Sequence, residues 1–219
     1  MGVELCRPHH EMQKREGVII FPSSRGKTGV SVSYNVIIIV VSLAWFLSEV
    51  ILARLKRSAD TDAKADKFSL RILWTVIILS IASGVFLASQ RPGHFGGGSV
   101  VIPLTGLALI AAGLVVRWIA ILSLRRQFTV DVAITSGHRL IKGGIYRSVR
   151  HPSYTGSLMS FFGLGLCFAS YLTLLVIFVP IFSAFLYRVR VEEKALTGAF
   201  GEEYVQYCSS TKRFIPGVI

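Results

Sequence analysis

The stretch TGSLMSFFGLGLCFASYLTLLVIFVPIFSAFLY, residues 155–187, decides the fold. It contains 33 residues and not one formally charged side chain. As a single helix it would extend about 50 Å, which exceeds the hydrocarbon core of about 30 Å. It therefore predicts two short membrane-spanning helices joined by a tight turn at FASY, residues 168–171. We expect Pro180 to kink the second of them.

Three further apolar segments lie upstream, near residues 34–53, 70–89 and 100–124. Each contains the roughly 20 residues that a membrane-spanning helix requires. The composition agrees, because 52% of the 219 residues are hydrophobic, only 16% are charged, and the mean hydropathy is +0.59. The sequence predicts an all-α integral membrane protein with about five transmembrane helices.

We expect three regions along the chain. Residues 1–33 are polar and lack the apolar stretch of a signal peptide, so they predict an N-terminal tail. Residues 34–124 contain the first three predicted helices. Residues 125–219 contain a polar loop, the helical hairpin and a C-terminal helix.

The net charge of +12 predicts a partner with negative charge. Because the basic residues lie between apolar segments, anionic lipid headgroups explain them better than nucleic acid does. Seventeen Lys and Arg residues lie on one side of the membrane, in or beside the loop between the first and second predicted spans, the loop between the third and fourth, and the C-terminal segment. Six lie on the other side, in the N-terminal tail and the loop between the second and third spans. This asymmetry predicts an outside N-terminus and a cytoplasmic C-terminus, in the inner or plasma membrane if the source is bacterial.

Two polar stretches flank the hairpin. RRQFTVDVAITSGHRLIKGGIYRSVRHPSYTG, residues 125–156, precedes it, and YRVRVEEKALTGAFGEEYVQYCSSTKRFIP, residues 187–216, follows from its second helix. In the latter, Arg188 and Glu192 are four residues apart and share a helix face. A solvated surface ion pair would explain these two residues alone. Because the two ends of a hairpin are adjacent, however, we expect both stretches to meet at one cytoplasmic site.

Glu49 and Arg117 are two of the ionisable residues that lie within or near the predicted spans. Glu49 is close to the end of the first span and Arg117 lies inside the third. An ionisable residue at membrane depth is a functional hypothesis, but a Glu49 pair or a side chain that reaches the membrane surface explains Arg117 equally well. His138 and His151 lack carboxylate or cysteine partners at ligand spacing, so no metal site is predicted.

The residues TSGHRLIKGGIYRSVRHPSYTG, followed by an apolar hairpin and then RVRVEEKALTGAFGEEYVQYCSSTKRFIPGV, resemble the isoprenylcysteine carboxyl methyltransferases and their bacterial and archaeal relatives. The resemblance covers roughly residues 125–217, and five spans is the number in the short prokaryotic members. It implies a methyltransferase core over residues 125–219 that binds S-adenosylmethionine at the cytoplasmic face.

The resemblance also implies roles for individual residues. Arg188 would bind the methyl acceptor, and Arg188, Glu192 and Glu193 would form the catalytic group. The cofactor would be bound by residues of the loop, the start of the hairpin and the C-terminal helix: His138, Arg139, Leu140, Ile141, Tyr146, His151, Pro152, Ser153, Tyr154 and Glu192.

The acceptor stays open at this point. An isoprenylcysteine-like carboxylate is already ionised at pH 7 and needs no general base. A lipid amine or small thiol would need deprotonation, for which Glu193 or His151 is suited. The partners implied are a lipophilic or prenylated substrate and membrane lipids, without nucleic acid.

Two other functions remain as alternatives. A reductase of the sterol type has a related C-terminal architecture, but it needs a nicotinamide dinucleotide, further basic residues and more spans than this chain contains. A lipid-binding or transport protein would carry polar residues at mid-bilayer or repeated half-helices, for which Arg117 is the only candidate.

Overall fold

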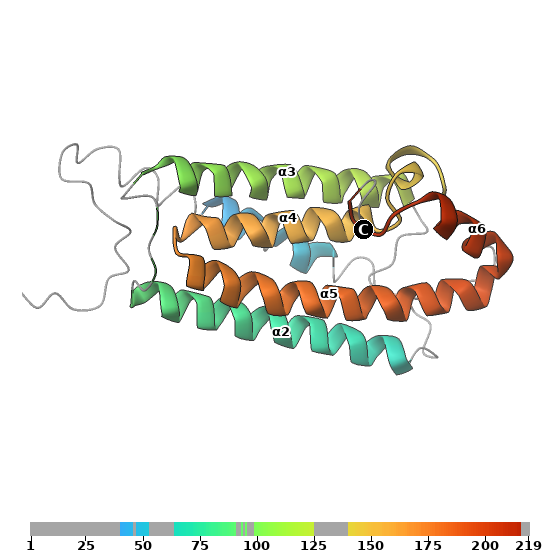
Figure 1. Cartoon of the computed structure of the whole chain (residues 1–219), viewed down its shortest axis with the longest axis horizontal. Coiled ribbons are helices and arrows are strands. Elements are labelled where there is room, and N and C mark those ends of the chain that lie inside the picture. The colour runs from blue at the N-terminus through green and yellow to red at the C-terminus, as the bar shows by residue number, and fades with distance from the viewer. Residues whose placement is uncertain are drawn as a thin grey trace, which may run out of the picture.

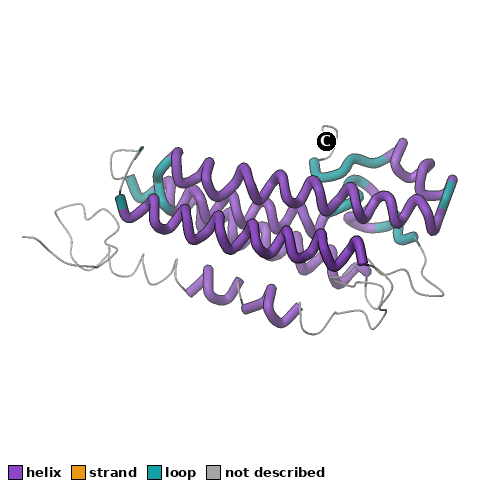
Figure 2. Tube along the Cα trace, turned by 90° about the horizontal axis from the view of Figure 1, so that it is seen from below, coloured by secondary structure: helices purple, strands orange, loops and turns teal. Residues whose placement is uncertain are grey.

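A computed structural model describes residues 40–45, 47–52, 64–90, 93, 95, 99–124 and 140–215. Within these ranges the protein is helical, without a named strand (Figure 2), and Val149 and Lys212 form an isolated parallel bridge. The predicted N-terminal tail lies outside the described residues. The elements in chain order are the helix Val40–Leu52, α2 (Lys64–Ser89), α3 (Val101–Leu124), the 3-10 helix η2 (Gly144–Arg147), α4 (Pro152–Cys167), α5 (Tyr171–Phe200) and α6 (Glu202–Ser210).

Three helices of the described part are long and apolar enough to cross a membrane. They are Phe68–Ser89 within α2, all of α3 and all of α5. Large apolar side chains such as Ile78, Phe86 and Leu122 are more than half exposed on these helices, as lipid contact requires. The helix Val40–Leu52 and the 16-residue α4 occupy the positions of the two other predicted spans, but as described they are shorter than the roughly 20 residues of a full crossing.

The hairpin predicted from residues 155–187 is confirmed. α4 ends at Cys167, and α5 begins at Tyr171 after a short turn. Ala169 occupies the left-handed region in this turn, with φ of 47°, and the Ser170 hydroxyl accepts a 3.3 Å hydrogen bond from the Thr173 N–H at the start of α5. α5 continues through Pro180 to Phe200, past the ends of α3 and α4 (Figure 1).

α3 and α4 pack against each other with their backbones in direct contact. A Cβ atom on Gly156 would lie 2.5 Å from the Gly113 carbonyl oxygen, and one on Gly163 would lie 2.5 Å from the Gly106 carbonyl oxygen. Small residues permit this close approach in membrane helices, where packing rather than burial from water drives association. The two contacts are seven residues apart on each helix, so they fix the antiparallel register.

The C-terminal segment returns to the start of α4. The Arg150 N–H donates to the Lys212 carbonyl at 2.7 Å, and the His151 N–H donates to the Arg213 carbonyl at 3.1 Å. Figure 1 places the C-terminal segment beside the first turn of α4, with α6 between it and the end of α5. One end of the bundle therefore gathers the start of α4, the end of α5, η2 and α6.

Candidate functional site

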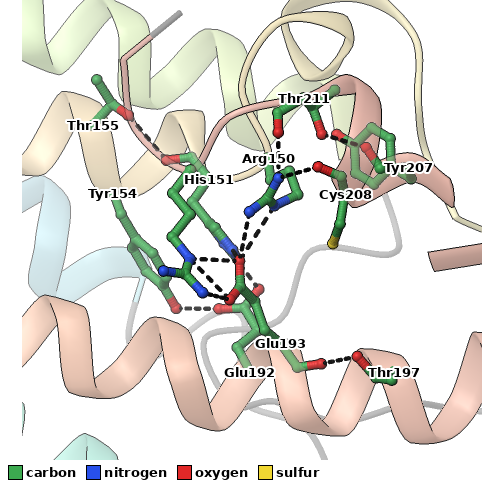
Figure 3. Close-up of polar contacts among 11 residues, drawn as sticks. Arg150, His151, Tyr154, Thr155, Glu192, Glu193, Thr197, Tyr207, Cys208 and Thr211 are labelled. Atoms are coloured by element: carbon green, nitrogen blue, oxygen red, sulfur yellow. Dashed lines mark hydrogen bonds and ion pairs between the residues drawn. The ribbon is translucent and has the colours of Figure 1, made fainter. Parts of the chain in front are cut away.

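The first turn of α4 meets α5 through Tyr154 and Glu192. The Tyr154 hydroxyl donates a 2.7 Å hydrogen bond to Glu192 Oε2. The His151 ring stacks on the Tyr154 ring at a centroid distance of 5.7 Å and an interplanar angle of 13°, and its Nδ1 lies 3.8 Å from Glu192 Oε1. Figure 3 shows His151 and Tyr154 reaching from α4 toward Glu192 and Glu193 on α5. The predicted meeting of the two polar stretches is confirmed.

Arg188 lies one turn before Glu192 and is 1% exposed, so it is not part of a solvated surface pair. Its Nη1 donates a 2.5 Å hydrogen bond to Ser69 Oγ on α2. The positive charge of Arg188 also interacts electrostatically with the Tyr154 hydroxyl on α4. A buried guanidinium is costly unless its donors are used, and α2, α4 and α5 all contribute to its surroundings. We call His151, Tyr154, Arg188 and Glu192 the α4–α5 cluster.

Glu193 is the acceptor for two arginines. Arg213 donates from Nη2 and Nε to Glu193 Oε2 at 2.7 and 3.0 Å, and Arg150 donates from Nη2 to Oε1 at 3.2 Å. His151 Nε2 lies 3.4 Å from the same Oε1. The hydrogen bonds to Glu193 raise the pKa of the Arg213 guanidinium above its ordinary value. Glu193 thus joins α5 to the start of α4 and to the C-terminal segment.

Arg150 extends this network to the end of α6. Its Nη1 donates to the Cys208 carbonyl at 3.0 Å and also to the Thr211 carbonyl (Figure 3). The Arg150 side chain is 10% exposed and that of Glu193 is 12% exposed. Removing one partner of such a buried pair typically costs about 3–5 kcal/mol, because the other charge stays buried. The network therefore fixes the position of the α4 start relative to α5.

Tyr146 of η2 is buried, and both its hydroxyl and its backbone carbonyl form hydrogen bonds. Its hydroxyl donates to the Ala120 carbonyl of α3 at 3.3 Å, and its own carbonyl accepts a 2.5 Å hydrogen bond from the Tyr207 hydroxyl. Burial raises the pKa of Tyr146, and the Glu192 carboxylate raises it further. The phenol is neutral, with its hydroxyl bound to α3. The cofactor contact expected of Tyr146 stays a prediction, and its ring rather than its hydroxyl would make that contact.

Pro152 and Ser153 form the first turn of α4 and are both buried. Proline is suited to the first helical position because no backbone N–H is lost there. The Ser153 hydroxyl accepts a 3.0 Å hydrogen bond from Arg117 Nη1, so it faces α3. Direct cofactor contacts by these two residues stay predictions.

The loop before η2 is described from Leu140 onward. Leu140 and Ile141 are half-buried and lead into η2. His138 and Arg139 lie outside the described residues. The cofactor contacts expected of these four residues therefore stay predictions.

Tyr204 is a candidate site residue to which the sequence analysis gave no role. Its side chain is 2% exposed, and its hydroxyl has no hydrogen-bond partner among the described residues. Burial raises the pKa of Tyr204, and the charges of Glu193 and Glu192 raise it further. A buried neutral hydroxyl without a partner typically costs about 1–3 kcal/mol. Tyr204 therefore carries a buried neutral hydroxyl that is within the electrostatic reach of Glu193 and Glu192.

Arg150 and Arg213 were also missed. Arg213 contacts Glu193 because the C-terminal segment folds back along residues 148–151, whereas Arg150 contacts it from the residue before the α4 N-cap. The signal in the sequence was weak. Arg150 and Arg213 had no assigned partner, and of the adjacent glutamates only Glu192 had been paired with an arginine.

A separate pocket of about 360 Å³ lies between η2 and α6. Its lining includes neither Tyr154 nor Glu192, so we do not assign it to the α4–α5 cluster. The residues that line it are Lys142, Arg147, Gln206, Tyr207, Ser210 and Thr211.

Comparison with known sequences identifies relatives over this same region. A family model for phospholipid methyltransferases matches residues 101–203, from α3 into α6. Protein-S-isoprenylcysteine O-methyltransferase A of Arabidopsis thaliana is 31% identical over 115 residues, which are 52% of this chain and 58% of the plant protein. The chain thus matches less than two thirds of the length of this relative. Protein-S-isoprenylcysteine O-methyltransferase of Saccharomyces cerevisiae is 29% identical over 203 residues, covering 90% of this chain and 83% of the yeast protein.

A solved structure has the same fold. The eukaryotic intramembrane Ras methyltransferase, an isoprenylcysteine carboxyl methyltransferase, superposes with a TM-score of 0.54 over 85% of this chain and 66% of that chain, at 20% sequence identity. At that identity the likeness establishes the fold, and the three long apolar helices agree with an integral membrane protein. The chain is therefore similar in sequence to isoprenylcysteine carboxyl methyltransferases and shares the fold of one of them.

Proposed function

We propose that the protein is a membrane methyltransferase that moves a methyl group from S-adenosylmethionine to the carboxylate of an isoprenylcysteine-like acceptor. The observation that carries this proposal is the contact between Tyr154 and Glu192, 2.7 Å across the two ends of the hairpin. It brings together the two motifs on which the family resemblance rests. The plant and yeast relatives are protein-S-isoprenylcysteine O-methyltransferases, which supports the same reaction.

The α4–α5 cluster fits the chemistry of the proposed donor. S-adenosylmethionine supplies an electrophilic methyl group on a positively charged sulfonium, together with an ammonium and an adenine. The Glu192 side chain is 26% exposed, so its carboxylate is accessible to an ammonium while Tyr154 fixes its position. The stacked His151 and Tyr154 rings offer flat surfaces to adenine or to a cation.

Arg188 is suited to orient a carboxylate acceptor. Its guanidinium is fixed by Ser69 on α2 and lies one turn from Glu192. A planar guanidinium binds a carboxylate through two parallel hydrogen bonds, which sets the direction of the attacking oxygen. Because that oxygen is already ionised at pH 7, the site needs to align the reactants and exclude water rather than to remove a proton.

The bonds of Glu193 argue against this residue as the general base that an amine or thiol acceptor would need. A general base for an amine or thiol must have a free oxygen within reach of the acceptor. Both Glu193 oxygens accept from arginines, so proton transfer would compete with those bonds. We infer an organising role for Glu193 and assign the contacts with the reactants to Glu192 and Arg188.

We also infer that the site faces the cytoplasm. The lysines and arginines of the described part concentrate at the end of the bundle that carries η2 and α6, for example Lys142, Arg147 and Lys212. A cysteine placed at Arg147 in a chain without its native cysteines tests this orientation. A membrane-impermeant thiol reagent should label it from the cytoplasmic side, and labelling from outside would reverse the topology.

The reaction is tested by methyl transfer. The purified protein in lipid nanodiscs is incubated with S-adenosylmethionine that carries a labelled methyl group and, separately, with a prenylated cysteine, a phosphatidylethanolamine and a small thiol. The proposal expects a base-labile labelled ester on the prenylated cysteine. Label on the amine or the thiol alone would keep the donor and reject the acceptor, and no transfer with a folded protein would reject the reaction.

A further inference from the structure

A buried polar network within the membrane-spanning part lies next to the α4–α5 cluster. Arg117 of α3 makes a two-pronged ion pair with Glu49 of the helix Val40–Leu52, with Nε 2.5 Å from Oε1 and Nη2 donating to Oε2 at 2.5 Å. The two side chains are 11% and 15% exposed. One of the alternatives considered from the sequence, a pair between Arg117 and Glu49, is therefore present.

The third nitrogen of Arg117 is used on a different helix. Nη1 donates to Ser157 Oγ at 2.8 Å, to Ser153 Oγ at 3.0 Å and to the Ser153 carbonyl at 3.3 Å, all in the first two turns of α4. An ion pair alone would satisfy only one side of the guanidinium. The planar fork of donors lets a single side chain connect the first helix to α4, which a lysine ammonium cannot do in the same geometry.

The backbone of α4 permits this connection. A Cβ atom on Gly156 would lie 2.7 Å from the Arg117 backbone nitrogen, so the backbones of α3 and α4 are in direct contact at Arg117. The contact is short and direct, without long side chains between the helices. The Arg117 guanidinium itself reaches the first turn of α4 through its hydrogen bonds to Ser153.

That first turn lacks the support that most helix starts have. His151 is its N-cap residue, but the His151 side chain makes no capping hydrogen bond and instead faces Glu192 and Glu193. Ser153 lies between His151 and Tyr154 in the chain. Arg117 thus holds the turn through Ser153 from the α3 side, while His151 and Tyr154 face α5 on the other side.

We propose that Arg117, oriented by Glu49, is a positioning residue for the methyl-donor site. It sets the rotation of the first turn of α4 and thereby the placement of the His151 and Tyr154 rings relative to Glu192. The inference rests on the proposed function of the α4–α5 cluster. It gives the first helix, which contributes no residue to that cluster, a part in donor binding.

The test separates positioning from stability. Both Arg117→Met and Ile110→Ala should destabilise the packing of α3. The first removes the bonds of Arg117, and the second removes a fully buried side chain two turns earlier on that helix. Titration of S-adenosylhomocysteine by calorimetry is compared between them at temperatures equally far below each melting temperature. Arg117→Met is expected to lose about tenfold or more in affinity, because small misplacements of binding groups are costly, and Ile110→Ala is expected to bind as the wild type does. Equal affinities in the two variants would overturn the proposal.

Exchanging the charges of Glu49 and Arg117 gives a second test of the proposal, independent of Arg117→Met. Glu49→Arg combined with Arg117→Glu restores an ion pair but places an acceptor opposite the Ser153 carbonyl. We expect a melting temperature above that of Arg117→Met and an affinity that stays low. Recovery of both would mean that the ion pair alone matters and would reject the role of the bonds to α4.

A conservative change covers the case in which the other variants do not fold. Arg117→Lys keeps the positive charge beside Glu49 and loses the forked donors, so we expect a folded protein with weakened donor-analogue affinity and an unchanged KM for the acceptor. Wild-type affinity in Arg117→Lys would contradict the inference. If the wild type itself binds no S-adenosylhomocysteine, the proposed function fails and not the positioning role.

Discussion

The Tyr154 hydroxyl donates a 2.7 Å hydrogen bond to Glu192 across 38 residues of chain. The contact closes the hairpin of α4 and α5 at the end where both helices carry polar residues. Because Tyr154 also stacks on His151, the position of the Glu192 carboxylate is tied to two aromatic rings.

Replacing Tyr154 with Phe should weaken donor binding without unfolding the protein. The ring and its stacking remain, while Glu192 loses a charge-assisted hydrogen bond worth about 1.5–3 kcal/mol. We expect S-adenosylhomocysteine affinity to fall by about tenfold, in line with that energy. Tyr171→Phe, at the exposed start of α5, is the matched control and should bind normally. An unchanged affinity in Tyr154→Phe would remove the hydroxyl from the site.

Arg188 and Glu192 should have separable effects on kinetics. Arg188→Lys keeps a charge at the buried position but loses the planar fork that would align a carboxylate. We expect kcat to fall and the KM for the acceptor to rise, with donor-analogue affinity within a few-fold of the wild type. Steady-state assays with each substrate varied in turn measure this split. A loss of donor affinity in Arg188→Lys as large as that in Glu192→Ala would contradict the separation between acceptor orientation by Arg188 and donor binding by Glu192.

The Glu193 network should matter mainly for stability. Glu193→Ala leaves Arg150 buried without its carboxylate partner, which typically costs about 3–5 kcal/mol. We therefore expect a clearly lower melting temperature in detergent for this variant. Lys194→Met, its exposed neighbour on α5, provides the control and should melt with the wild type. Comparable melting of the two variants would show that the network contributes little.

The folded protein should lose stability in alkaline solution partly through Tyr207. Burial raises the pKa of Tyr207 from 10.0 to about 12. Between these values the unfolded chain has released the proton and the folded chain has kept it. The stability from this group is therefore complete below pH 10 and is lost as the pH rises through 12. Tyr207→Phe should have a lower melting temperature at neutral pH but a shallower decline over that window, and parallel declines would contradict the assignment.

The sequence predicted the parts of the fold that depend on local patterns. An uncharged run of 33 residues is too long for one crossing, so the hairpin and its turn followed from length alone. The meeting of the two polar stretches, which contain Tyr154 and Glu192, then followed because the ends of a hairpin are adjacent. The pair between Glu49 and Arg117 was one of three open interpretations of Arg117, beside a functional role and a side chain that reaches the membrane surface.

The sequence did not predict contacts that depend on the exact return of the chain. Arg213 reaches Glu193 because the backbone of residues 212–213 pairs with that of residues 150–151, and the Cys208 and Thr211 carbonyls accept hydrogen bonds from the Arg150 side chain there. No periodicity signals a bridge of that kind. The direction of Ser153 was also hidden, because a serine in the first turn of α4 can face either α3 or α5, and the close contact at Gly113 and Gly156 brings Arg117 to it.

The most direct measurement of the central claim is calorimetric titration of S-adenosylhomocysteine into the wild type and into Glu192→Gln. Glu202→Gln, an exposed residue at the start of α6, serves as the control for charge removal. The proposed site predicts micromolar binding by the wild type and by Glu202→Gln, and a loss of about tenfold to a hundredfold in Glu192→Gln because one charge-assisted contact is removed. No heat from folded wild-type protein, or equal binding by all three proteins, would contradict it.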